Sequence, residues 1–145
     1  MDHLYASLVY LHVLSVIVSI GPFFVLLYIG GNLRHAEGKE TTFLLKIFHF
    51  SVRLTKHAGH VLVGTGVLLI YLGPWKWSTP WIVMTLLVMF SSIFFLARAF
   101  TPKLKKFHDP AVDKNLLITS LIRSTWIYIM LLSLMLWFMV IKPTF

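Results

Sequence analysis

Apolar residues dominate four stretches of the chain, and polar residues gather in the links between them. The apolar stretches cover about residues 4–29, 48–72, 81–100 and 116–141. A helix that crosses a membrane needs roughly 20 apolar residues, and lipid offers no water to satisfy backbone groups, so each stretch should be helical. The pattern predicts an all-α fold, an integral membrane antiparallel four-helix bundle that forms one domain over residues 1–145.

Helix boundaries can be read from the residues that flank these stretches. Thr41 or Thr42 is predicted to cap the second helix, and Asp113 is predicted to cap the fourth, because their side-chain oxygens can accept a hydrogen bond from the first helical turn. The second helix then runs from about residue 41 to 72. Because that length is roughly 45 Å at 1.5 Å per residue, its first turns should project beyond the bilayer or tilt strongly.

A stripe of polar side chains climbs along the second predicted helix. Its members recur every three or four residues and therefore share one helical face. They are Lys46, His49, Arg53, Lys56, His57 and His60. Charged and imidazole groups inside a membrane span are costly and normally face a bundle interior, a water-filled cavity or a ligand. These six residues, which we call the polar stripe, are therefore predicted to point inward and to serve function.

One further histidine, His12, lies inside the first apolar stretch. It should lie roughly 12 Å from the outer end of its helix, and His60 roughly 18 Å from the outer end of the second, at 1.5 Å per residue. A short link makes these helices neighbours, so His12 can approach His60 or, less easily, His57. Two histidines on facing helices can ligate one haem iron. His12 and His60 are the predicted metal ligands, with His57 as the substitute.

Cationic side chains near these histidines suit the propionates of a haem. Arg53 and Lys56, together with Arg123 on the last helix, are predicted to bind them. Each residue also has a plainer interpretation, because Arg53 and Lys56 can snorkel to lipid head groups and a lone interior histidine is often only hydrogen-bonded. As a set that includes His12, they point to a bound cofactor.

The composition supports a membrane protein and argues against nucleic acid as a partner. The 145 residues are 58% hydrophobic, with 13 Lys and Arg against 5 Asp and Glu, for a net charge of +8. The basic residues concentrate in and around the first and third links, which is the positive-inside pattern. It predicts a multi-pass protein of the bacterial plasma membrane with both termini outside. The lipid bilayer is the expected partner, with anionic head groups as a secondary ligand.

Other chemistry is limited by what the chain lacks. Without cysteine there are no disulfides and no thiolate metal sites. All five carboxylates lie outside the apolar stretches, which disfavours a carboxylate-driven proton pump. Five methionines in the third and fourth stretches serve either packing, their commoner use, or a copper path. They are Met84, Met89, Met130, Met135 and Met139.

Several short motifs resemble a broad set of small four-span bacterial membrane proteins. The motifs are Leu11-His12 with Gly21, Arg34-His35-Ala36-Glu37, Arg53-Leu54, and Val140-Ile141-Lys142-Pro143. The set includes HemJ-type protoporphyrinogen oxidases, CopD-like copper-resistance domains and uncharacterised predicted integral membrane proteins. The resemblance implies haem binding by His12, as the first-helix histidine is thought to do in the HemJ type. That type also has a basic, histidine-bearing third helix, whereas residues 81–97 here have neither feature.

The leading hypothesis is therefore a membrane protein that binds haem b and acts in electron transfer or porphyrin handling, with a redox partner or a porphyrin as its partner. One alternative is a non-enzymatic membrane protein that assists transport or assembly, with the polar stripe contacting lipid or a partner. The other is copper handling through histidine and methionine. A homo-oligomer is compatible with each, and the sequence identifies neither a substrate nor an enzymatic activity.

Overall fold

The computed structural model describes residues 2–107 and 109–143. These residues form helices joined by short links, with no strand among them, so the all-α prediction is confirmed. The helices are α1 (Asp2–Leu33), α2 (Lys39–Leu72), α3 (Pro80–Ala99), α4 (Thr101–Lys106) and α5 (Lys114–Ile141).

Three helical stretches are long and apolar enough to cross a membrane. They are α1, the combined stretch of α3 and α4 from Pro80 to Lys106, and α5. The sequence led us to expect four such stretches, but α2 is not among those that meet these criteria. The reason is chemical, since α2 carries the polar stripe, called the α2 stripe from here on, and its cations and imidazoles interrupt the apolar residues.

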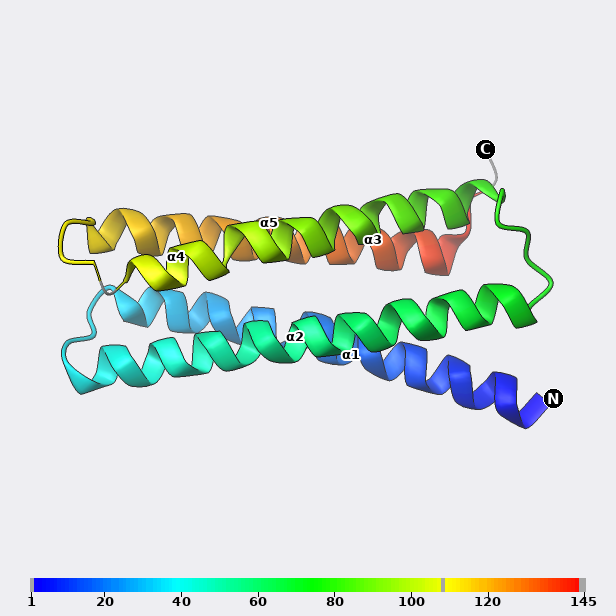
Figure 1. Ribbon diagram of the computed structural model, residues 1–145, viewed down its shortest axis with the longest axis horizontal. Coiled ribbons are helices and arrows are strands. Elements are labelled where there is room, and N and C mark those ends of the chain that lie inside the picture. The colour runs from blue at the N-terminus through cyan, green and yellow to red at the C-terminus, as the bar shows by residue number, and fades with distance from the viewer. Residues whose placement is uncertain (1, 108, 144–145) are drawn as a thin grey trace.

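The four long helices lie side by side along the length of the molecule (Figure 1). Helices α1 and α2 make one closely packed pair and α3 and α5 another, while α1 also packs against α5. The start of α1 and the end of α5 lie at the same end as the link between α2 and α3, which we call the terminal end (Figure 1). The opposite end, the basic end, carries the links 34–38 and 107–113.

The helix ends match the predicted stretches at some positions and extend them at others. Asp113 caps α5 as predicted, since its carboxylate accepts a hydrogen bond from the Asn115 N–H at 3.0 Å. The predicted cap at Thr41 or Thr42 is wrong, because α2 begins earlier, after Gly38 in a left-handed conformation with φ 57° and without a side-chain cap. Beyond Phe100, α4 continues α3 toward the basic end (Figure 1).

An aromatic cluster holds the middle of the helices together. Phe23 packs edge-on against Phe100 at 5.4 Å between ring centroids and lies 4.5 Å from Tyr128. Phe48 of α2 joins the same cluster through Phe100, at 6.1 Å. All four rings are buried, and each aromatic pair adds about 0.5–1.5 kcal/mol beyond its buried area. The cluster therefore ties α1, α2 and α5 to the junction of α3 and α4.

Small polar residues allow α1 and α2 to approach closely. Ser19 and Thr55 are buried between the two helices, and the Thr55 hydroxyl donates to the Ser19 carbonyl at 3.3 Å. Small side chains of this kind are the usual means by which membrane helices pack. The close approach fixes the rotation of α2 about its own axis, and this rotation decides which α2 residues reach His12.

Candidate functional site

A cavity of about 480 Å³ lies in the half of the molecule nearest the terminal end, lined by residues of α1, α2, α3 and α5. Its walls are mostly aliphatic and aromatic side chains. Among its lining residues His12 is the one imidazole and Lys142 is the one charged side chain. A mostly apolar cavity of this size with few polar groups is typical of small-ligand sites.

His12 projects from α1 and contacts two other helices through its ring nitrogens. Its Nδ1 lies 2.9 Å from the Thr65 hydroxyl of α2, and its Nε2 lies 3.3 Å from the Met139 sulfur of α5. The ring also covers Gly66, where an added Cβ would come within 3.2 Å of the imidazole Cε1. Three helices thus fix the position of one imidazole.

The hydrogen bonds around Thr65 assign the tautomer of His12. The Thr65 hydroxyl donates to the Val61 carbonyl at 2.8 Å and also lies 3.1 Å from the Leu62 carbonyl. A hydroxyl has a single hydrogen, so the Thr65 oxygen must accept its third contact, from the Nδ1–H of His12. The Nε2 atom then carries a lone pair, and this lone pair faces the Met139 sulfur.

Two lone-pair atoms that face one another do not form a hydrogen bond. Nε2 of His12 and the thioether of Met139 are both metal ligands, and they lie at the wall of the cavity. A histidine that binds a metal generally donates its other ring N–H to a nearby oxygen, which is what His12 does toward Thr65. The arrangement therefore has the chemistry of a ligand pair with its supporting hydrogen bond.

The α2 stripe faces away from this site. All six of its side chains are exposed, so the expectation that it points inward is wrong. The buried face of α2 has the same helical period and consists of Leu45, Phe48, Ser51, Thr55, Ala58, Leu62 and Thr65. At 3.6 residues per turn the centres of the two faces are about 180° apart. The apolar and small residues of α2 face the interior because they can pack on α1, whereas the charged and imidazole side chains of the stripe cannot.

This rotation separates the predicted histidine ligands. On α2, His60 lies about 140° around the helix axis from Thr65, the residue that contacts His12, at 3.6 residues per turn. His60 and His57 are exposed, and no described hydrogen bond joins either to His12. The structure therefore brings His12 together with Thr65 and Met139 and not with the histidines of the α2 stripe.

The cations predicted to bind propionates also lie away from His12. Arg53 and Lys56 are exposed and lie about 18 Å and about 14 Å from Thr65 along α2, at 1.5 Å per residue. Arg123 is exposed too, and it lies about 24 Å from Met139 along α5 by the same rise. Their positions suit a surface role better than a contact with a ligand at His12.

Thr65 and Met139 were not singled out as partners of His12 from the sequence. One available signal was the depth of each residue below the outer end of its helix. Thr65 lies about 10 Å from the end of α2 at 1.5 Å per residue, which is closer to the depth of roughly 12 Å estimated for His12 than the roughly 18 Å of His60 is. No comparable signal existed for Met139, because pairing α1 with α5 requires the arrangement of all the helices.

An aromatic and cationic group, formed by Trp75, Trp81 and Lys142, lines part of the cavity. The Lys142 ammonium lies 4.6 Å from the centre of the Trp75 ring and 5.5 Å from that of Trp81. The two tryptophans pack edge to face at 5.2 Å. Such cation–π contacts hold the lysine at the cavity wall and give the site one positive charge.

Within residues 2–107 and 109–143, no group of three or more His, Cys, Asp or Glu side chains is placed to hold a metal ion. A site at His12 must therefore use methionine sulfur or an exogenous ligand. No protein-family model, no curated protein and no solved structure matches the chain, so the resemblance described above stays an expectation.

Proposed function

We propose that the chain is an integral membrane protein, folded as an antiparallel four-helix bundle, that binds a metal-centred ligand on Nε2 of His12. The observation that carries the proposal is the hydrogen bond from Nδ1 of His12 to Thr65, which leaves the Nε2 lone pair directed at Met139 beside an apolar cavity. The three apolar helical stretches support insertion in a membrane.

The proposal includes an orientation in the bacterial plasma membrane. Basic residues concentrate at the basic end, where Arg34, Lys103 and Lys114 lie, and such residues favour the cytoplasmic side. Both termini, and with them the cavity, then belong to the outer half of the bilayer. A ligand of His12 would enter from the outer side or from the outer leaflet.

Haem b, in electron transfer or porphyrin handling, is one form of this proposal, with His12 as an axial ligand. A haem iron between His12 and Met139 needs its two axial atoms about 4.3 Å apart, whereas Nε2 and the sulfur are 3.3 Å apart. His60 is exposed on the far face of α2. Haem on His12 alone therefore requires the Met139 side chain to turn away from Nε2, whereas a single ion shared by His12 and Met139 uses both atoms where they already lie close together.

Absorption spectra of the detergent-purified protein, oxidised and reduced, together with its metal content, test the proposal. We expect His12→Ala to lose the bound ligand and His60→Ala, the matched control on the exposed face, to keep it. Equal ligand content in both variants would contradict the proposal. A wild type that takes up neither haem nor a metal ion when these are supplied would reject it.

A second candidate function rests on a different observation, the outward-facing α2 stripe. A charged side chain at the centre of a membrane span costs about 2.5–3.5 kcal/mol on insertion scales, so exposed cations such as Arg53 and Lys56 need cover from head groups or from another protein. A non-enzymatic protein that assists transport or assembly would use this face for contact with a partner.

A further inference from the structure

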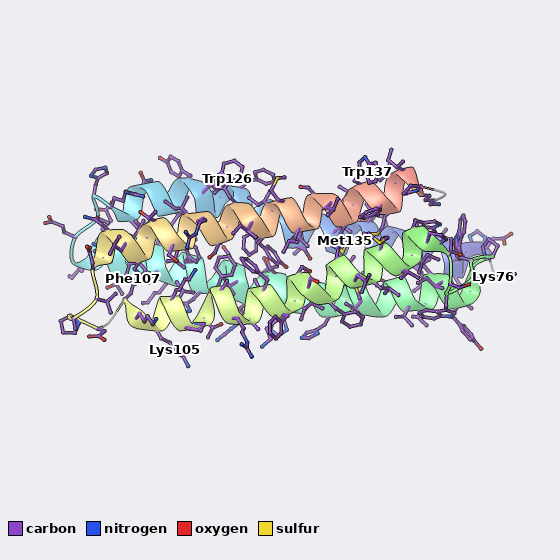
Figure 2. All side chains as sticks on the ribbon, turned by 90° about the horizontal axis from the view of Figure 1, so that it is seen from above. Lys76, Lys105, Phe107, Trp126, Met135 and Trp137 are labelled. Carbon is purple, nitrogen blue, oxygen red and sulfur yellow. The ribbon has the colours of Figure 1, made fainter. Side chains whose placement is uncertain are left out.

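Three methionines line the cavity that His12 enters. Met139 touches the imidazole, Met135 lies one turn earlier on the same face of α5, and Met89 projects from α3. Met135 and Met89 are buried, at 1% and 7% exposure. Figure 2 shows Met135 between α5 and α3, while Trp137 lies on the outside. Sulfur is therefore the main source of metal ligands that the interior offers next to His12.

We infer that His12 and Met139, completed by Met135 or Met89, form a binding site for a soft monovalent metal ion, copper(I). The inference rests on the proposed role of His12 Nε2 as a ligand and names the chemical class that this atom would bind.

The distance between the two ligand atoms fits one ion without movement of the helices. Metal bonds to imidazole nitrogen and to sulfur are about 2.0 Å and about 2.3 Å long. With 3.3 Å between Nε2 and the sulfur, an ion bonded to both would subtend an angle of about 100°, near the tetrahedral value. Such an ion lies roughly 45° off the line from Nε2 to the sulfur, so binding needs a rotation of the Met139 side chain that brings its sulfur out of the path of the Nε2 lone pair. Thr65 would keep the imidazole in the required tautomer through its hydrogen bond from Nδ1.

Ligand type and charge both favour copper(I) over harder or divalent ions. Thioethers are soft ligands that select copper(I), and no Asp, Glu or Cys is among the residues that line the cavity. Every ligand in the set is neutral, and the cost of moving an ion out of water rises with the square of its charge. The ammonium of Lys142 at the cavity wall adds a repulsion that is smaller for a monovalent ion.

The competing interpretation is that these methionines only pack the interior, as methionine commonly does. Leucine separates the two interpretations, because Met→Leu keeps the hydrophobic volume and removes the sulfur. The matched control is Met130, which lies on the same helix but is 65% exposed and outside the cavity.

The experiment is a competition titration of the full-length protein, purified in detergent with a tag that contains no histidine. Copper(I) is held reduced by ascorbate and shared with a chromogenic copper(I) chelator, and silver(I) serves as a probe that is not oxidised. We expect Met139→Leu to weaken binding roughly tenfold or more. Thr65→Val should weaken binding about 10-fold to 100-fold, and Met130→Leu should leave it unchanged.

The result that would overturn the inference is equal copper(I) affinity in Met139→Leu and Met130→Leu. X-ray absorption of the copper-loaded wild type needs no variant, and a spectrum with nitrogen ligands and no sulfur would also overturn it, since exposed histidines such as His57 would then hold the ion. Haem binding at His12 without copper(I) binding rejects this inference alone. If neither binds, the proposed function fails as well.

Discussion

His12 and the α2 stripe are two polar regions of the long helices, and their side chains lie in opposite environments. His12 is a single half-buried imidazole whose two nitrogens both contact side chains of other helices. The stripe consists of six exposed side chains on one helix. Helix α2 takes part in both regions, with Thr65 on one face and the stripe on the other.

The difference teaches that polar residues recurring at the helical period show that a helix has a polar face and not in which direction that face points. The direction is set by the opposite face, whose residues pack on the neighbouring helix. On α2 the packing face includes Phe48 in the aromatic cluster and Thr55 against α1. The stripe is turned outward as a result, and mutations can test the two regions independently.

The largest effect that this comparison predicts comes from filling the space beside His12. In Gly66→Val the new Cβ lies 3.2 Å from the imidazole Cε1, which is tighter than an ordinary contact, so the ring must shift from its position between Thr65 and Met139. We expect metal or haem affinity to fall roughly a hundredfold, because the ligand geometry is lost. The measurement is the same titration used for the wild type.

Gly64→Val is the matched control for this change. It introduces the same β-branched residue on α2, but an added Cβ at Gly64 meets nothing within 4 Å. Equal loss of affinity in the two variants would show that helix propensity, and not the space beside His12, governs binding.

The sequence predicted the helices well because their apolar runs are long, and it placed their ends less well. The first predicted stretch, residues 4–29, became Asp2–Leu33, since Gly30 and Gly31 stay helical. His12 could be picked out as a polar residue within an apolar run. Its contacts with Thr65 and Met139 could not, because they depend on the rotation of α2 and on α5 lying beside α1.

The next effect concerns the exposure of the two faces of α2. The chain contains no cysteine, so a single introduced thiol reports its own surroundings. We expect Lys56→Cys in detergent to react with a maleimide about tenfold faster than Thr65→Cys, because Lys56 is exposed and Thr65 is buried. Equal rates would mean that α2 is rotated from the position described here.

The same thiol tests the second candidate function in native membranes. If a partner protein covers the stripe, Lys56→Cys should be protected in membranes and become reactive when detergent removes the partner. Slow reaction alone does not distinguish cover by protein from cover by lipid, because only the thiolate reacts and apolar surroundings suppress its formation. A photo-cross-linking residue introduced in place of Lys56 in native membranes makes the distinction, since it yields a larger protein adduct if a protein covers the stripe and none if lipid does.

A smaller effect is expected at the cationic part of the cavity wall. Lys142→Gln removes the one charged side chain among the lining residues, and copper(I) affinity should rise about threefold because a repulsion between like charges is lost. Since Lys142 is exposed, the gain should shrink as ionic strength increases. A fall in affinity would indicate that Lys142 closes the cavity over its ligand through Trp75 and Trp81.

The smallest effect on the ligand is expected from the stripe itself. Arg53→Gln with Lys56→Gln removes two cations that lie on the outward face of α2, about 14 Å or more along the helix from Thr65. Exposed charges at that distance are largely screened, so haem or copper(I) content at His12 should stay within about twofold of wild type. If the haem propionates do bind Arg53 and Lys56, the double variant should instead lose haem and lower its reduction potential, since removing nearby cations favours the ferric form.

A reporter fused after the last residue measures the orientation of the double variant independently of its ligand content. Loss of two basic residues from α2 weakens the orientation signal, so mixed orientation with an intact His12 ligand would confirm that the two regions act separately.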